Sequence, residues 1–343
     1  MNTKLLYGII ALLVLTIASL GYVYVERSEQ PPSPTPAITT QEPLDTQEPT
    51  DTQDLASPAE FMDMESTGTE LSGAVTVSSG WIENPTTGDL QSVRLYEPTS
   101  SGPYPLVILI PGGSGDGSSF ERPNLDTKDQ LPDTINLAHE GFIVVVYSPL
   151  GTGDSEGEVN YQGHDDQDGL AAIIAAAQAL PQTDADNTGL ASFSYGVTGA
   201  AGVLARYPEL GVKYWSDWEG PSSRFYTTVG CPRSPSRDGD ISPANFPCSD
   251  DAHWDEREAS IFIQSLSLDY YWRIQEDRDH VQPSHDHTLE MLDGALENSN
   301  IQWVRVNDGE INTAYTADTL PTVPNTSHFP TYALPHIVEL SQM

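Results

Sequence analysis

The chain has 343 residues, enough for a membrane anchor and one sizeable folded domain. Its formal net charge is −36, its pI is about 4.1, and its only lysines are Lys4, Lys128 and Lys213. This balance argues strongly against a nucleic-acid partner, because such a partner requires a basic surface. The acidic residues are spread along the chain, which is typical of proteins that work at high salt concentration, as in halophilic organisms.

The N-terminus carries an apolar run, LLYGIIALLVLTIASLGYVYV, over residues 5–25. At about 1.5 Å per residue, a helix of this length spans roughly 30 Å, the thickness of a bilayer core. The bulky residues 22–25 are poor neighbours for a signal-peptide cleavage site, so an uncleaved signal anchor is expected over residues 1–27. The competing interpretation is a cleaved signal peptide.

Residues 28–60 are rich in Pro, Thr, Gln and acidic side chains, and they cannot bury enough apolar surface to fold. We expect a disordered stalk here, followed by one domain over residues 61–343. The large acidic body and its two cysteines favour a single-pass protein of the cell membrane, with this domain on the extracellular side.

Strand-like and helix-like segments alternate along the domain. Strands are expected at 73–79, 90–96, 106–110, 142–147, up to Ser194, at 212–218, 270–275 and 302–307. Helices are expected at 133–140, 163–179, 197–206 and 332–340. The first two strands suit a hairpin or meander, and the later alternation predicts an α/β fold with a mostly parallel sheet and helices on both faces.

The segment LASFSYGVTG, residues 190–199, indicates a strand that turns sharply at Ser194 into a helix of small residues. Such a turn holds a serine hydroxyl clear of the backbone, and it requires small residues two positions away on either side. Those positions are Ser192 and Gly196, so the pattern is S-x-S-x-G instead of the usual G-x-S-x-G.

Four motifs in this order resemble the α/β-hydrolase superfamily over about residues 70–340. They are a buried strand entering a Gly-rich loop (ILIPGGSG, 108–115), a G-x-G-x-S-x-G loop (YSPLGTGDSEG, 147–157), the serine turn, and the loop RIQEDRDHVQP at 273–283. The resemblance is to serine esterases and peptidases, including dienelactone-hydrolase and prolyl-oligopeptidase types. It implies the α/β-hydrolase fold.

The resemblance implies Ser194 as the nucleophile, with the backbone amides of Tyr195 and Gly113 as oxyanion donors. It also places the acid at Asp279, in a D-x-V-x-P turn after a late strand. Other acidic residues compete for this role: Glu276 and Asp277 in the same turn, and more distantly Asp217 and Glu219.

The base should follow the acid, and the resemblance places it at His328, in a loop before the last helix. His336 is the alternative, although it falls inside the expected helix. His280, His285 and His287 cluster after Asp279, but their spacing fits no defined set of metal ligands, so we expect a solvated helix start and no metal.

From residue 221 to about 259 the periodicity stops, which is typical of a lid insertion over an active site. Cys231 and Cys248, the only cysteines, lie within it. Outside the cell they suit a disulfide, and two reduced buried thiols are the alternative.

Together these observations predict a membrane-anchored, extracytoplasmic serine hydrolase that cleaves an ester or a peptide bond through a Ser-His-Asp triad and an acyl-enzyme. No cofactor is expected. The alternative is a non-catalytic module of the same fold that binds a ligand or partner, which the unusual Ser192 would favour.

Overall fold

The computed structural model describes residues 59–113, 115–123, 130–227, 231, 247–280, 284–325 and 332–343. The expected anchor at residues 1–27, and the stalk up to residue 58, lie outside this part of the chain. Among the residues described, no helix has both the length and the apolar character needed to cross a bilayer.

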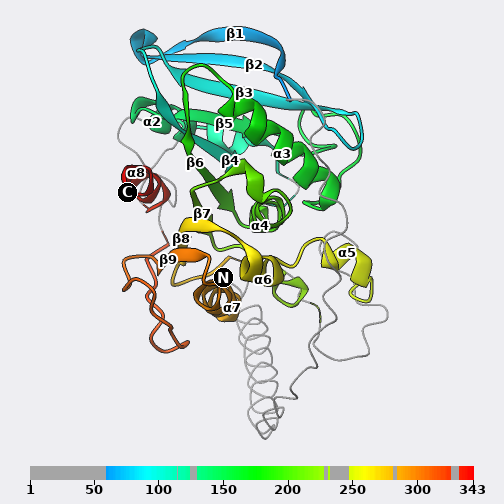
Figure 1. Ribbon diagram of the computed structural model, residues 1–343, viewed down its shortest axis with the longest axis vertical. Helices are drawn as coiled ribbons and strands as arrows, with labels where there is room; N and C mark the ends of the chain where they lie inside the picture. The colour runs from blue at the N-terminus through cyan, green and yellow to red at the C-terminus, as the bar shows by residue number, and fades with distance from the viewer. Residues whose placement is uncertain are drawn as a thin grey trace, which may run out of the picture. The chain divides into compact units, whose positions relative to one another are not determined.

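A nine-stranded sheet forms the centre of the described domain, in the order β1-β2-β3-β5-β4-β6-β7-β8-β9 (Figure 1). The three strands β1–β3 are antiparallel to their neighbours, and the strands from β4 to β9 pair in parallel. Their bounds are β1 Met62–Glu70, β2 Val75–Glu83, β3 Leu90–Pro98, β4 Tyr104–Ile110, β5 Ile143–Tyr147, β6 Thr183–Phe193, β7 Tyr214–Trp218, β8 Leu268–Ile274 and β9 Ile301–Val306. This confirms the predicted α/β architecture with a mostly parallel sheet.

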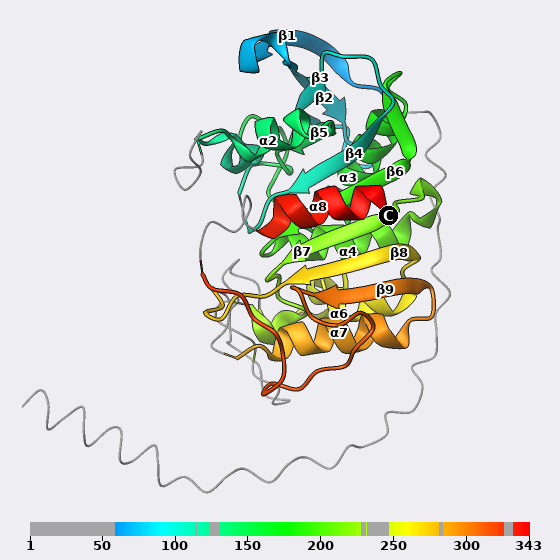
Figure 2. The ribbon, with the colours of Figure 1, turned by 90° about the vertical axis from the view of Figure 1, so that its left-hand side faces the viewer.

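Helices cover both faces of the sheet. Helices α3, α4, α6 and α7 lie on one face, whereas α2 and α8 lie on the other (Figure 2). The bounds are α2 Asp133–His139, α3 His164–Gln178, α4 Gly196–Arg206, α5 Asp251–Asp255, α6 Ala259–Phe262, α7 Asp286–Glu297 and α8 Leu334–Gln342. Short 3-10 helices occur at Leu71–Gly73, Gly117–Glu121, Pro208–Leu210, Arg224–Tyr226 and Ile263–Ser265.

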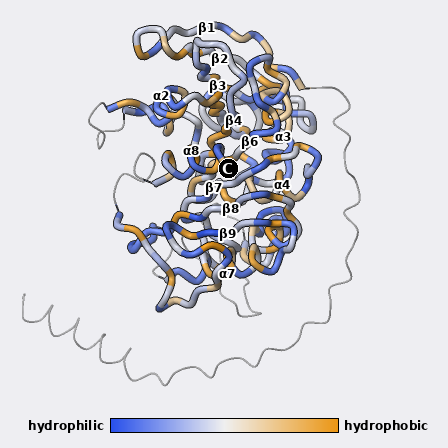
Figure 3. The backbone as a smooth tube through the Cα atoms, turned by 60° about the vertical axis from the view of Figure 1, so that its left-hand side comes forward, coloured by the Kyte–Doolittle hydropathy of each residue, from blue (hydrophilic) through white to orange (hydrophobic). Residues whose placement is uncertain are grey.

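The central strands are buried on both faces because helices cover each side. All five residues of β5, and the last five of β4, are buried, as a continuous apolar run requires in a parallel sheet. Each face of the sheet builds its own apolar cluster with the helices that cover it. Hydrophilic segments lie mainly toward the outside of the domain (Figure 3).

Strand β1 was not predicted. Its sequence, MDMESTGTE, is mostly polar and exposed, so it lacks the apolar pattern on which strand prediction depends. It adds to the sheet by pairing antiparallel with β2. The predicted hairpin of β2 and β3, the helices at α2, α3, α4 and α8, and the strands from β4 to β9 are confirmed within a few residues.

The predicted lid region is described only at residues 221–227, at Cys231 and at 247–259, so a lid over the active site stays a prediction. In this region the structure joins Cys231 to Cys248 by a disulfide that closes a loop of 17 residues. Both cysteines are buried against Trp254 and Phe225. These side chains form a small apolar cluster that is separate from the two clusters at the sheet. The buried Arg224 guanidinium pairs with Glu258 and Asp251 in the same region.

We expect reduction of this disulfide to destabilise the domain. A closed loop of this size lowers the conformational entropy of the unfolded chain. In the chain-entropy model this stabilises the folded protein by about 3 kcal/mol. Thermal unfolding followed with and without dithiothreitol should therefore show a lower midpoint in the reduced protein. The double variant Cys231→Ala/Cys248→Ala serves as control, because its midpoint should not respond to the reductant. An identical midpoint for the oxidised and reduced wild type would contradict the assignment.

Candidate active site

Ser194 occupies the sharp turn between β6 and α4. Its φ of 51° lies in the left-handed region, which is uncommon for a non-glycine residue and is typical of a strained functional turn. Small residues are required around it: a Cβ on Gly112 would lie 2.8 Å from Ser194 Cβ, and one on Gly196 would lie 2.7 Å from the Pro111 carbonyl oxygen. The chain therefore folds into the turn that the sequence predicted.

Ser192 stands where the usual pattern of this turn has glycine. It is buried at the end of β6, and its hydroxyl accepts a hydrogen bond of 2.8 Å from Nε1 of Trp215. The hydroxyl therefore satisfies a buried indole N–H of the neighbouring strand β7. The unusual residue is thus explained by packing, and it does not disturb the turn at Ser194.

A histidine lies against the serine hydroxyl. Nε2 of His280 is 2.8 Å from Oγ of Ser194, and Nδ1 of the same ring is 2.8 Å from Oε2 of Glu219. Because an ionised carboxylate can only accept, Nδ1 carries the proton, and Nε2 is free to accept the proton of the serine hydroxyl. The three side chains form a continuous serine–imidazole–carboxylate chain. Sequence analysis did not assign this role to His280.

Glu219 follows β7 directly, and its side chain is completely buried, whereas the His280 side chain is 37% exposed. Its second oxygen, Oε1, accepts from the backbone N–H of Glu276 at 2.6 Å and from Nε2 of Gln275 at 3.0 Å. Glu219 also has a positive φ of 46°. The carboxylate is therefore fixed at one oxygen and offers the other to the imidazole.

Trp218 lies flat on the His280 ring. The two rings are 4.5 Å apart at their centroids and only 3° from parallel. Trp218 also contacts Phe193, which in turn packs against Phe120, so a row of aromatic side chains leads up to the imidazole. This stack restricts the ring to one plane while its edge faces Ser194.

The structure brings Asp279 to a different histidine from the one beside Ser194. Its Oδ2 atom accepts from Nε2 of His287 at 2.7 Å and from Nε2 of Gln275 at 2.8 Å, and both Asp279 and His287 side chains are fully buried. Because the base predicted for Asp279, His328, lies outside the described residues, the sequence-based role of Asp279 stays a prediction. The more distant alternative, Glu219, has the expected geometry.

His328, the predicted base, lies outside the residues that the structure describes. The alternative, His336, belongs to α8, and its ring stacks on that of Trp272 in β8. Burial lowers the pKa of His336 to about 4. It belongs to the apolar packing of the domain, on the face of the sheet that α8 covers.

Three potential metal ligands come close together at the site. The ligand atoms of Glu219, Asp279 and His280 lie within 4.8 Å of one another. However, Glu219 and His280 are already hydrogen-bonded to each other, and Asp279 is bonded to His287. All three side chains therefore take part in hydrogen bonds of the site.

The two predicted oxyanion donors border the serine turn. Tyr195 caps α4 immediately after Ser194, and its ring packs on Tyr161 with centroids 4.5 Å apart. Gly113 follows the glycine that touches the turn, and its φ of 58° is in the left-handed region. Both residues therefore lie in loops that approach Ser194.

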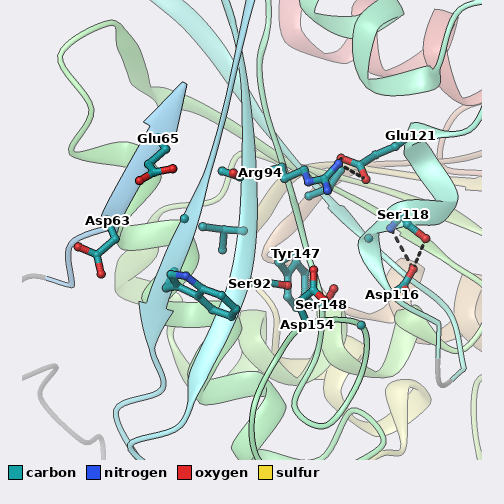
Figure 4. A pocket seen from close by; sticks show the side chains of 17 residues that line it. Asp63, Glu65, Ser92, Arg94, Asp116, Ser118, Glu121, Tyr147, Ser148 and Asp154 are labelled. Carbon is teal, nitrogen blue, oxygen red and sulfur yellow. Dashed lines mark hydrogen bonds and ion pairs between the residues drawn. The ribbon is translucent and has the colours of Figure 1, made fainter. Parts of the chain in front are cut away.

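A separate polar cavity of about 380 Å³ opens between β2, β3 and the loop after β4 (Figure 4). Five of its 17 lining residues are acidic, and the one arginine among them, Arg94, is paired with Glu121 at 2.9 Å. Its lining includes neither Ser194 nor His280 nor Glu219. It is therefore distinct from the serine–histidine–glutamate constellation.

Comparison with solved structures identifies the fold. An acetyl xylan esterase from Paenibacillus sp. R4 is similar with a TM-score of 0.57 and 10% identity, covering 82% of this chain and 89% of that one. An S-formylglutathione hydrolase from Agrobacterium tumefaciens has a TM-score of 0.54 and 12% identity, covering 82% of this chain and 99% of that one. Acetyl xylan esterase 1 from Thermoanaerobacterium sp. JW/SL YS485 has a TM-score of 0.52 and 16% identity, covering 81% of this chain and 87% of that one. The fold is that of the α/β-hydrolase superfamily, as the resemblance implied.

No curated protein matches the sequence. A family model does: the X-Pro dipeptidyl-peptidase (S15) family matches residues 29–215. This match covers more than half of the chain and includes β6 and Ser194, but it ends before Glu219 and His280. Family and fold are both those of hydrolases, and the chain belongs to the X-Pro dipeptidyl-peptidase (S15) family.

Proposed function

We propose that this protein is a serine hydrolase in which Ser194, His280 and Glu219 form the catalytic triad. The observation that carries the proposal is the pair of 2.8 Å contacts that link the serine hydroxyl to the imidazole and the imidazole to the buried carboxylate. A serine hydroxyl needs such a base to become a nucleophile, and the base needs a partner that fixes its tautomer. Glu219 takes the role that the sequence motif had given to Asp279.

In this mechanism the Ser194 oxygen attacks an acyl carbonyl while Nε2 of His280 takes its proton. The same nitrogen then donates that proton to the leaving group, and an acyl-enzyme on Ser194 remains. Water, deprotonated by His280, attacks the acyl carbon, the bond between that carbon and the Ser194 oxygen breaks, and His280 returns the proton to Ser194 as the acid leaves. Glu219 stabilises the imidazolium that forms in each half of the reaction.

The developing oxyanion needs fixed donors, and we assign this role to the backbone amides of Tyr195 and Gly113. One amide directly follows the nucleophile, and the other belongs to the loop whose Gly112 touches the serine turn. Each donor of this kind contributes about 3–4 kcal/mol of transition-state stabilisation in serine hydrolases.

The scissile bond belongs to an ester or a peptide. Membership of the X-Pro dipeptidyl-peptidase (S15) family favours a peptide bond that follows proline. The similar esterase structures establish the fold alone, because their identity to this chain is between 10% and 16%. We therefore expect peptides with proline next to the scissile bond to be the preferred substrates, and small acyl esters to be the second candidates.

Membrane attachment forms part of the proposal. The apolar run at residues 5–25 supports an anchor, and the acidic, proline-rich residues 28–60 support a stalk for the domain over residues 61–343. The Cys231–Cys248 disulfide suits an oxidising exterior, and the net charge of −36 suits a salt-rich one.

A second buried acid stands beside the triad. The Glu276 side chain is completely buried and accepts a hydrogen bond from Nδ2 of Asn325. Burial, together with the nearby negative charge of Glu219, raises the pKa of Glu276 to about 8. At neutral pH the Glu276 carboxyl therefore keeps its proton, which avoids a second negative charge next to Glu219.

Replacing the triad residues should distinguish the role of the nucleophile from the roles of the base and the acid. We expect Ser194→Ala to abolish labelling by a fluorophosphonate probe, because the attacking oxygen is gone. His280→Ala and Glu219→Gln should lower kcat by roughly 10³-fold or more, because the serine loses its base or the base loses its orientation. Hydrolysis of Ala-Pro-p-nitroanilide and p-nitrophenyl acetate provides the rate and separates peptidase from esterase activity.

Two matched variants control this experiment. Asp279→Asn tests the acid that the sequence motif favoured, and His328→Ala tests the corresponding base. Both should retain far more activity than His280→Ala. Loss of activity in His328→Ala combined with full activity in His280→Ala would contradict the proposed triad, and absence of labelling in the wild type would favour a ligand-binding module.

The raised pKa of Glu276 predicts a pH dependence of stability. The unfolded chain loses this proton near the ordinary pKa of 4.5, whereas the folded protein keeps it until about pH 8. The stabilising contribution is therefore complete below about pH 4.5 and is lost as the pH rises toward 8. Denaturant unfolding at pH 5 and pH 8 should show a smaller loss of stability for Glu276→Gln than for the wild type. Equal losses in both proteins would contradict this assignment.

The membrane proposal predicts where the protein is found. Full-length protein should sediment with membranes, and protease added to intact cells should release or digest the domain, because the stalk is accessible from outside. A variant without residues 1–27 should lose the membrane association. Recovery of the full-length protein in the soluble fraction would contradict the anchor.

A further inference from the structure

A chain of buried hydrogen bonds connects Arg273 to the carboxylate of the proposed triad. Nε of Arg273 donates to Oγ1 of Thr288 at 2.8 Å, the Thr288 hydroxyl donates to Oε1 of Gln275, and Nε2 of Gln275 donates to Oε1 of Glu219 at 3.0 Å. None of these four side chains is exposed to solvent. Arg273 and Gln275 come from β8 and its end, and Thr288 comes from α7.

The direction of this chain is determined by the chemistry of its first member. A guanidinium can only donate, so Thr288 accepts from Arg273 and has its own proton left for Gln275. The Gln275 amide must therefore turn its carbonyl oxygen toward Thr288. Its NH₂ group then faces the carboxylates of Glu219 and Asp279, which are both within 3.0 Å.

The same arginine also holds the backbone on either side of Glu219. One of its NH groups pairs with Asp217, two residues earlier, and another donates to the carbonyl of Gly220 at 2.6 Å, one residue later. The same Arg273 nitrogen lies 3.0 Å from Nδ1 of His287, which accepts from it while Nε2 of His287 donates to Asp279. Glu219 is therefore held at its side chain through Gln275 and at its backbone through Arg273.

These contacts assign the two oxygens of Glu219 to different tasks. Oε1 is occupied by Gln275 and by the Glu276 amide, and only Oε2 faces Nδ1 of His280. If the Gln275 amide turned over, its carbonyl oxygen would face the Glu219 carboxylate, and the two acceptors would repel each other. The Thr288 hydroxyl prevents this reversal because it donates only to the carbonyl end of the amide.

We propose that Thr288 and Gln275 are positioning residues of the triad, which set the orientation of the Glu219 carboxylate toward His280 without touching either Ser194 or the substrate. This inference rests on the triad proposed above. It extends the functional site to α7, through a threonine more than 90 positions beyond the nucleophile in the sequence.

The test compares Thr288→Val with Thr288→Ser. Valine keeps the shape and removes the hydroxyl, whereas serine keeps the hydroxyl. We expect Thr288→Val to lower kcat by up to about 100-fold with KM changed less than about twofold, as for a misplaced catalytic group. The acid limb of its kcat/KM profile should move to lower pH, because a misaligned carboxylate stabilises the imidazolium less. Thr288→Ser should restore both properties.

Two further variants keep the test decisive. Thr134→Val makes the same exchange at a buried position in α2 and should leave kcat and the pH profile unchanged. Gln275→Met keeps the length of the side chain but removes the donor to Glu219, so it should reproduce the lower kcat and the shifted limb even if Thr288→Val fails to fold.

Two outcomes overturn the inference, and a third overturns its basis. The positioning role is wrong if His280→Ala and Glu219→Gln are inactive while Gln275→Met and a folded Thr288→Val keep the wild-type kcat and pH profile. It is also wrong if Thr288→Val and Thr288→Ser lower kcat equally with an unmoved acid limb. If instead His280→Ala and Glu219→Gln remain active, the proposed triad itself is wrong.

Discussion

The parallel pairing of β6, β7 and β8 is the constraint on which the rest of this site depends. Strands in a sheet lie about 4.8 Å apart, so the loops that leave their carboxyl ends are immediate neighbours. Ser194 follows β6, Glu219 follows β7, and His280 follows β8 within a short turn. Residues separated by 86 positions in the chain therefore meet within hydrogen-bonding distance.

Rigid surroundings then make this meeting specific. Ser194 and Glu219 both have positive φ angles, and each is locked by a backbone hydrogen bond to the next strand: Ser194 N–H to the Trp218 carbonyl, and Glu219 N–H to the Ile274 carbonyl. Trp218 adds a flat surface that holds the imidazole in one plane. The backbone strain at these two left-handed residues is thus tolerated because the sheet and the aromatic stack hold the surrounding chain in one conformation.

Much of the architecture could be predicted from the sequence, because it follows from local patterns. Apolar runs marked β4 and β5, small residues marked the turn at Ser194, and Gly151 and Gly153 in the predicted loop adopt positive φ, as their type suggests. Strand β1 was not predicted because it is mostly polar and exposed and lacks an apolar pattern. The disulfide partners were predictable because the chain has only two cysteines.

The acid and the base of the proposed triad were harder to predict, for a physical reason. Strand ends that adjoin each other in a sheet all deliver side chains to one edge, so a carboxylate after β7 or after β8 can reach the same imidazole. In the sequence, Glu219 lies in YWSDWEG and is only a distant alternative for the acid, and His280 is one of three clustered histidines. In the turn after β8 the side chain of His280 faces Ser194, whereas that of the preceding residue, Asp279, bonds to His287, and this difference cannot be read from the local motif.

A crystal structure of the protein after reaction with diisopropyl fluorophosphate would test the central claim most directly. The account predicts phosphorus bonded to Oγ of Ser194, with Nε2 of His280 within hydrogen-bonding distance of the adduct and Nδ1 still bonded to Glu219. An adduct on another residue, or a different imidazole such as that of His328 beside Ser194, would contradict it.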